Sequence, residues 1–275
     1  MADPILDEFK RDLAKLGELL DLVDAQKNAA IIDESTIQME EGEAKQILIN
    51  LLSMSKLTHT SLPIMTGSLF LYVVGRFEEF SRTGFEDLCQ RMAAKANSFS
   101  QLPKEMRSNV VIYTAKVMDN PRKFGHGDGG VKTFVTTLSD NLVKDSVDEI
   151  NYQCLSITES NMRAEVLADM YRRIGVKDLW KKISNQAQML SYFETQEASQ
   201  VEKHSTSRLD EIMRLRNDLA HPSGTPNWPT LEKVREYSKF LVTLAEVLTS
   251  LSLVYEGSLV THAVDTGEAQ SKPSD

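Results

Sequence analysis

The chain has 275 residues, a formal net charge of −9 at pH 7, 41% hydrophobic residues and 26% charged residues. This length and composition are those of an ordinary folded protein and exclude collagen-like, fibrous and disordered classes. The negative charge argues against wide, nonspecific binding to duplex nucleic acid, because neutralisation of phosphates drives such binding. A small basic site on an acidic body is still compatible with this charge.

The N-terminus, the apolar runs and the cysteines bear on location and cofactors. Residues 1–15 mix acidic and basic side chains and lack an apolar segment, which is unlike a signal peptide. The longest apolar runs, residues 47–52 and 69–74, are far shorter than the roughly 18 residues of a membrane span. We therefore expect a cytoplasmic protein without membrane contact. Cys89 and Cys154 show no metal-ligand spacing, so we expect buried reduced thiols, no metal and no other cofactor.

Helical periodicity dominates the N-terminal third. Apolar residues recur every three or four positions across residues 5–23, which predicts an amphipathic helix. A break is expected across 28–38, where β-branched residues and Ser/Thr gather. A second helix is predicted over 41–55 and a third over about 64–96. The third is the most apolar, and we expect it to be central to the core.

The middle of the chain is less decisive. The residues after Pro103, up to Met118, fit a helix or a strand, and residues 131–143 and 152–157 are mixed. The Gly-rich stretch 123–131 has neither the residue order of a P-loop nor the spacing of GxGxxG. We interpret it as a flexible connection.

The C-terminal half again predicts helices. A helix opened by Asn161 should end at Gly175, and a short one should follow at 178–183. Residues 185–200 are predicted to be a loop or a solvated helix. Two more helices are expected, one capped by Ser205 or Thr206 that ends before Pro222, and a last one over 231–251. The tail after about Gly257 is polar enough to be disordered.

The most informative tract is Leu215-Arg216-Asn217-Asp218-Leu219-Ala220-His221-Pro222, at the end of a predicted helix. Around a continuous helix Arg216 and His221 would point about 140° apart, so they diverge unless the helix ends near His221, as Pro222 indicates. A bare R-x4-H spacing is weak evidence, and its context must decide. The same tract also fits a well-capped helix C-terminus, where polar and basic side chains satisfy the last carbonyls.

The tract resembles the R-x4–6-H motif of the HEPN superfamily, in which a polar residue, here Asn217, commonly follows the Arg. Residues 72–80, 102–106 and 161–180 also resemble the RiboL-PSP and MAE-type branches of that superfamily. The resemblance covers about residues 62–255. It implies an all-α fold, an antiparallel helical bundle with additional N-terminal helices. The implied division is an N-terminal helical extension (1–60), a HEPN-like helical domain (61–257) and a disordered tail (258–275).

The resemblance also implies a homodimer in which two motifs face one cleft, and a metal-independent endoribonuclease of the toxin or antiviral-defence type. His221 would move protons, since imidazole acts as acid or base near neutral pH, and Arg216 would offer a planar donor fork to the phosphate. Cleavage of single-stranded or loop RNA would leave 2′,3′-cyclic phosphate ends. Such an activity needs restraint, so an antitoxin or regulatory protein is an expected partner.

Other residues are assigned supporting roles. Asn217 would orient His221 or the phosphate, and Glu78 or Glu79 would pair with Arg216 or position it. A basic cluster with one aromatic residue could hold an RNA backbone and stack a base, or be only a solvated face. It consists of Arg172, Arg173, Lys177, Trp180, Lys181 and Lys182.

Two alternatives stay open. The chain could be a non-catalytic HEPN-like binding or assembly module, or a nucleotide-sensing domain. A hydrolase with a GxSxG elbow and a zinc enzyme with HExxH are excluded, because neither motif occurs in the sequence. The substitution His221→Ala separates an enzyme, which would lose cleavage, from a scaffold, which would keep its role.

Overall fold

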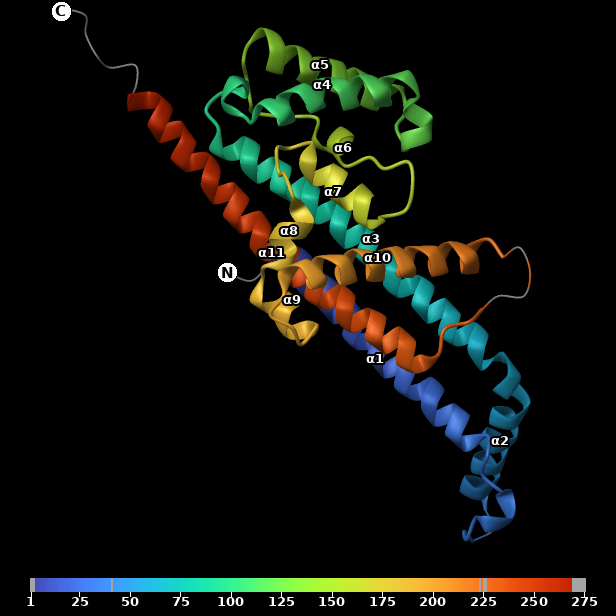
Figure 1. Cartoon of the computed structure of the whole chain (residues 1–275). Helices are drawn as coiled ribbons and strands as arrows, with labels where there is room; N and C mark the ends of the chain where they lie inside the picture. The colour runs from blue at the N-terminus through green and yellow to red at the C-terminus, as the bar shows by residue number, and fades with distance from the viewer. Residues whose placement is uncertain (1–2, 41, 223, 225–226, 269–275) are drawn as a thin grey trace, which may run out of the picture.

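The computed structural model describes residues 3–40, 42–222, 224 and 227–268, and in this part of the chain every regular element is helical (Figure 1). The predicted all-α fold is therefore confirmed. Four short 3₁₀ helices, η1 (Glu34–Thr36), η2 (His59–Ser61), η3 (Phe99–Gln101) and η4 (Pro121–Phe124), connect the α-helices. The α-helices are α1 (Pro4–Ala29), α2 (Glu43–Thr58), α3 (Leu62–Lys95), α4 (Lys104–Asp119), α5 (Asp128–Val143), α6 (Tyr152–Leu155), α7 (Ala164–Arg172), α8 (Leu179–Ser184), α9 (Ala187–Tyr192), α10 (Ala198–Ala220) and α11 (Leu231–Glu268).

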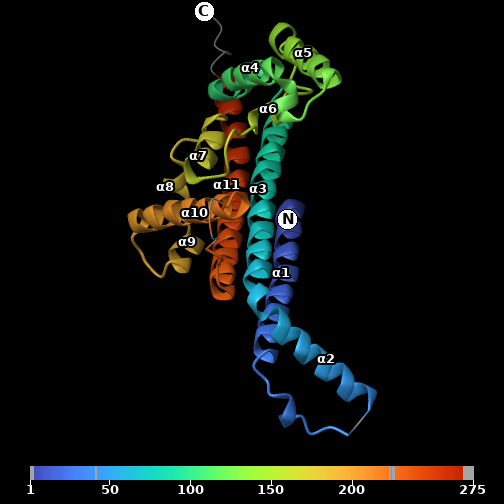
Figure 2. The same cartoon turned by 90° about the vertical axis from the view of Figure 1, so that its right-hand side faces the viewer.

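The core is built around α3, as its apolar sequence predicted. Buried residues continue along this helix from Leu62 to Ala93. α1 and α11 pack along it, with α1 antiparallel to both, and α10 packs across α3 (Figures 1 and 2). Phe77 of α3, Phe9 of α1 and Phe240 of α11 are fully enclosed in one apolar cluster. Burial of such rings is the main favourable contribution to folding.

The N-terminal 60 residues divide into two parts. The carboxylate of Asp3 accepts the N–H groups of Ile5 and Leu6 at 2.9 and 3.0 Å, which caps α1 and satisfies its first donors. The stripe predicted over residues 5–23 is the buried face of α1, so this helix completes the core. In contrast, α2 projects from the body and buries only Leu52 and Ser55 (Figure 2).

The undecided middle of the chain forms helices α4, α5 and α6. The Gly-rich stretch, predicted to be a flexible connection, joins η4 to α5. Gly125 takes a left-handed conformation with φ of 77°, the N–H of His126 donates to the carbonyl of Pro121 at 2.9 Å, and α5 begins at Asp128. A left-handed turn is easiest for glycine, which explains why this position needs no side chain. The stretch is therefore a tight turn between two helices.

Two helices in the C-terminal half begin at residues other than those predicted. α7 begins at Ala164 rather than Asn161, although it ends as expected before Gly175, whose φ is 94°. α10 begins at Ala198, so Ser205 and Thr206 do not cap it. The hydroxyl of Thr206 instead donates to the carbonyl of Glu202 one turn earlier, at 2.9 Å. Such back-bonding is the alternative to capping for Ser and Thr inside a helix.

The last helix is longer than the sequence predicted. α11 continues to Glu268, so residues 258–268 are helical where we expected the start of a disordered tail, and residues 269–275 lie outside the described part. Two stretches, 43–95 and 231–257, are long and apolar enough to cross a membrane by length and composition, with mean hydropathies of 1.3 and 1.4 in their most apolar windows. Core helices of soluble proteins pass the same test. One third and 44% of these windows are buried inside the protein.

Candidate functional site

Arg216 lies in the last turns of α10 and faces α3. Its guanidinium Nη2 is 3.7 Å from Oε2 of Glu78, and both side chains are mostly but not fully buried, with 29% and 23% exposed. The predicted pairing therefore involves Glu78. Glu79 contacts Arg82 and Thr83 on its own helix instead, so of the two alternatives the structure pairs Glu78, and not Glu79, with Arg216. The two carboxylates lie about 100° apart around α3, and only one of them can face α10.

Glu78 also holds the segment that precedes α7. Its second oxygen, Oε1, accepts the backbone N–H of Met162 at 3.3 Å. One carboxylate thus joins α3 to α10 and to residues 158–163. Both oxygens of Glu78 therefore have partners, one on α10 and one in the segment before α7.

Asn217 continues this attachment on α10. Its Oδ1 accepts from the side-chain amide of Asn161 at 2.5 Å. Two turns earlier, Oδ1 of Asp210 accepts the backbone N–H of Ala164 at 2.9 Å and so caps α7 from another helix. Asp210 and Asn217 are seven residues apart and share one face of α10. This face therefore anchors the start of α7.

His221 follows the last residue of α10. Its N–H donates to the carbonyl of Asn217 at 2.9 Å, which completes the helix end, and its backbone then leaves the helical conformation with φ of −134° and ψ of 65°. The ring is exposed, and no described residue bonds to it. Arg216 and His221 are therefore brought to the same end of one helix but do not contact each other within one chain.

Trp228 anchors the connection that runs from His221 to α11. Its ring packs against the core beside Gly67 of α3, where there is no space for a side chain: a Cβ at Gly67 would lie 2.5 Å from Cζ3 of Trp228. Pro229 is buried next to it. This contact fixes one end of the segment whose other end carries His221.

The predicted basic cluster separates into buried and exposed members. Arg173 is 7% exposed, and its guanidinium donates to the carbonyls of Leu155 and Ile157 at 2.7 and 2.8 Å and to Asp169. Trp180 is also 7% exposed, and its indole nitrogen donates to the carbonyl of Ala164 at 2.8 Å. A buried ring cannot stack on a base, so the structure gives both residues a structural role. Arg172, Lys177, Lys181 and Lys182 are exposed.

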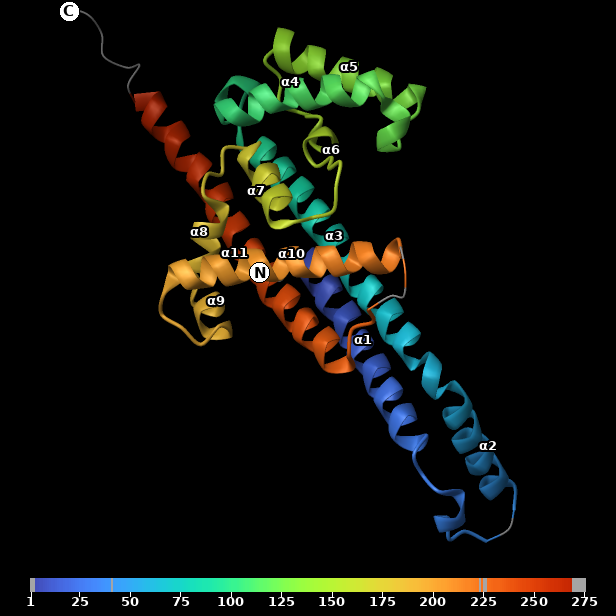
Figure 3. The same cartoon turned by 45° about the vertical axis from the view of Figure 1, so that its right-hand side comes forward.

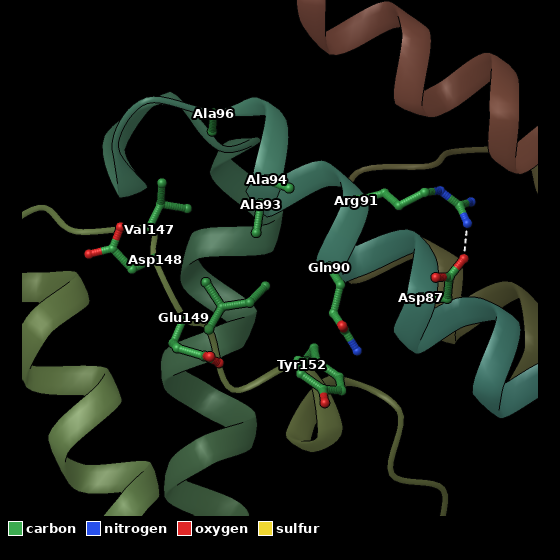
Figure 4. A pocket seen from close by; sticks show the side chains of 11 residues that line it. Asp87, Gln90, Arg91, Ala93, Ala94, Ala96, Val147, Asp148, Glu149 and Tyr152 are labelled. Carbon is green, nitrogen blue, oxygen red and sulfur yellow. Dashed lines mark ion pairs between the residues drawn. The ribbon is translucent and has the colours of Figure 1, made fainter.

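A cavity of about 510 Å³ lies at the far end of α3 (Figure 4). Its walls include Asp87, Asp148 and Glu149, and the cation Arg91 is already paired with Asp87. This acidic lining does not suit a phosphate. Within the described residues, no three His, Cys, Asp or Glu side chains are grouped so that they could hold a metal ion.

Sequence reasoning singled out three residues at the end of α10 but missed two that join α10 to the start of α7. Asn161 was interpreted only as the opening of a helix, and Asp210 was not singled out. Both contacts join residues more than 40 positions apart, and no local spacing indicates them. The two Asx side chains could have been found only from the packing of α10 against α7.

The described part of the chain is thus an all-α bundle that places Arg216, Asn217 and an exposed His221 at one end of α10. The chain matches the RiboL-PSP-HEPN family over residues 37–252 and belongs to this family. The resemblance stated from the sequence is thereby confirmed. Membership indicates an RNase-type or nucleotide-related function at the level of the family. No curated protein and no solved structure gives a significant match.

Proposed function

We propose that this protein is a metal-independent endoribonuclease that cuts single-stranded or loop RNA with Arg216 and His221. The observation that carries the proposal is the end of α10: the Arg216 guanidinium is held by Glu78, while the His221 ring is exposed and unbonded among the described residues. The Arg216 guanidinium lies where it can bind an anion, and the His221 ring is accessible to a group that gains or loses a proton. This is the division of work that cleavage of a phosphodiester needs.

In the proposed reaction the 2′-oxygen of a ribose attacks the adjacent phosphorus, and the bond from phosphorus to the 5′-oxygen breaks. A base takes the proton of the 2′-hydroxyl and an acid gives one to the leaving 5′-oxygen, so the products are a 2′,3′-cyclic phosphate and a 5′-hydroxyl. The Arg216 guanidinium offers two parallel N–H groups to the phosphate oxygens as their charge increases. Asn217 holds the helix end and so positions both partners.

We further propose that the active form is a homodimer. One imidazole cannot serve as base and acid in the same step, and the described part of one chain places no second histidine at this end of α10. A second copy would supply it. An active RNase must be restrained in its host, so we include an antitoxin or a regulatory protein as a partner, in a toxin or antiviral-defence role.

Purified protein is incubated with total RNA in EDTA, and the fragment ends are analysed. We expect 2′,3′-cyclic ends from the wild type and none from Arg216→Ala or His221→Ala. The matched controls are Arg214→Ala and His204→Ala, which remove the same residue types from exposed positions of α10 and should cut like the wild type. Light scattering reports the oligomeric state. Intact RNA with folded, dimeric protein would contradict the proposal and favour a non-catalytic binding module or a nucleotide sensor.

A further inference from the structure

A second cavity, of about 430 Å³, opens between α3, η4 and the connection from α6 to α7. Its size is within the range of small-molecule sites. Neither the proposed chemistry nor the predicted basic cluster uses any of its residues. It is unlike the acidic cavity at the end of α3, because two of its walls carry cations.

The cations are Arg82 of α3 and Lys123 of η4, with the ring of His126 beside them. Arg82 is paired with Glu79 and Lys123 with Glu159, and all four side chains are about half exposed. Exposed ion pairs of this kind are weak, so a phosphate can compete with the carboxylates. The one carboxylate in the cavity wall, Glu86, already accepts the hydroxyl of Ser156.

The other walls suit a nucleobase and a ribose. Phe124 presents a half-buried ring, and its neighbour Lys123 has its ammonium 5.4 Å from the ring centroid. The amide of Gln153 and the hydroxyl of Thr158 can donate to base edges or accept from a 2′-hydroxyl. Single-stranded RNA is recognised by this combination of an aromatic face, polar side chains and phosphate-binding cations.

The cavity and the Arg216 site share α3 and the connection from α6 to α7. Arg82 and Glu86 lie about one and two turns beyond Glu78, which corresponds to about 6 and 12 Å along α3. The connection from α6 to α7 borders the cavity at Ser156 and Thr158 and reaches the site at Met162. Figures 1 and 3 show this connection running from the α6 region toward the C-terminal end of α10.

We propose that this cavity binds a nucleotide of the RNA strand that flanks the two nucleotides at the cut. Arg82 and Lys123 bind its phosphate, and Phe124 stacks on its base. The inference rests on the proposed function, since it is the Arg216 site that defines which bond is cut. It assigns part of the binding of a longer substrate to residues that do not contact the reacting atoms.

Binding is measured with the full chain carrying His221→Ala, so that RNA is not cut, by fluorescence anisotropy of a labelled single-stranded oligonucleotide. Adding Lys123→Ala should weaken binding by about threefold to tenfold and lower its dependence on salt. The matched control is Arg122→Ala, which removes the same charge from the neighbouring exposed position outside the cavity wall and should change binding less than about twofold. Arg82→Gln serves as a second variant, and circular dichroism checks the fold of each.

Cleavage provides the second measurement, in chains that keep His221. With a long substrate Lys123→Ala should raise KM and leave kcat nearly unchanged, while a dinucleotide, which is too short to reach the cavity, should be cut equally by Lys123→Ala and Arg122→Ala. Equal binding and equal KM of these two variants on long RNA would overturn the inference and leave the proposed function intact. A third outcome is that the wild-type chain cuts no RNA while Lys123→Ala still weakens RNA binding. This outcome would overturn the proposed cleavage and keep the cavity as an RNA-binding site.

Discussion

The contact between Gly67 and Trp228 gives a prediction that depends directly on the packing of α3. In Gly67→Ala the new Cβ would lie 2.5 Å from Cζ3 of the Trp228 ring and closer still to Cε3. Carbon atoms pack at about 3.5–4.0 Å, so the ring or the helix must move by roughly 1 Å or more. Because Trp228 is packed against the core and Gly67 is buried, neither can move without loss of contacts elsewhere.

The magnitude follows from a comparison on the same helix. Gly75 is exposed on α3, with nothing within 4 Å of an added Cβ, so Gly75→Ala should stabilise the protein by up to about 1 kcal/mol through helix propensity alone. Gly67→Ala gains the same propensity but overpacks the contact, which costs about 1–3 kcal/mol. We therefore expect Gly67→Ala to have a free energy of unfolding about 1–3 kcal/mol below that of Gly75→Ala.

Urea unfolding followed by circular dichroism measures both values. A double-mutant cycle isolates the contact: in a Trp228→Ala background the difference between Gly67→Ala and Gly75→Ala should shrink strongly, because the ring that the methyl meets is gone. Equal stabilities of the two alanine variants in the presence of Trp228 would refute the close packing of the indole ring on Gly67. An unchanged difference after the removal of Trp228 would show that another neighbour causes it.

Two further predictions concern the positioning of Arg216 and the buried thiols. Glu78→Gln keeps an oxygen for the N–H of Met162 and loses only a partly exposed charge, so it should lower the free energy of unfolding by less than about 1 kcal/mol. Glu78→Ala leaves that N–H without its acceptor and should lower it by about 1–3 kcal/mol. Urea unfolding measures both values. Burial raises the pKa of Cys154 to about 11 and the pKa of Cys89 well above its usual value, so a thiol reagent at about pH 8 should label neither cysteine in the folded protein and both after unfolding. The same raised pKa values mean that the unfolded chain loses these protons first, so the free energy of unfolding should fall as the pH rises from about 9 toward 11, and a flat profile there would contradict the burial of the two thiols.

The fold was predictable where one pattern was strong. The apolar stripes of α1, α3 and α11 are long, and burial of a stripe is what makes a helix stable in a protein. α4 and α5 stayed undecided because β-branched residues such as Val110 and Val131 fit a strand equally well, and only packing against neighbours settles the choice. Ser205 was predicted to cap a helix because serine is typical of caps, but it lies buried within α10.

The candidate site was predictable only in its local part. Arg216, Asn217 and His221 lie within six consecutive positions, so their spacing shows in the sequence. The choice between Glu78 and Glu79 was not predictable, since neighbours on one helix differ only in which of them faces α10. The cavity of Arg82 and Lys123 combines residues from three separate elements, none of which forms a motif by itself.

Arg216 and His221 are attached to different parts of the fold. Arg216 takes its direction from Glu78 and therefore from the packed core of α3, as the Asn217 and Asp210 contacts do from α7. His221 lies beyond the last turn, and the connection that it begins is attached to the core at Trp228. Arg216 is thus attached through helix packing, whereas the described part of the connection that follows His221 contacts the core at Trp228. Under the proposed function, a partner or an RNA that acts on this connection would change the position of the imidazole without disturbing the core.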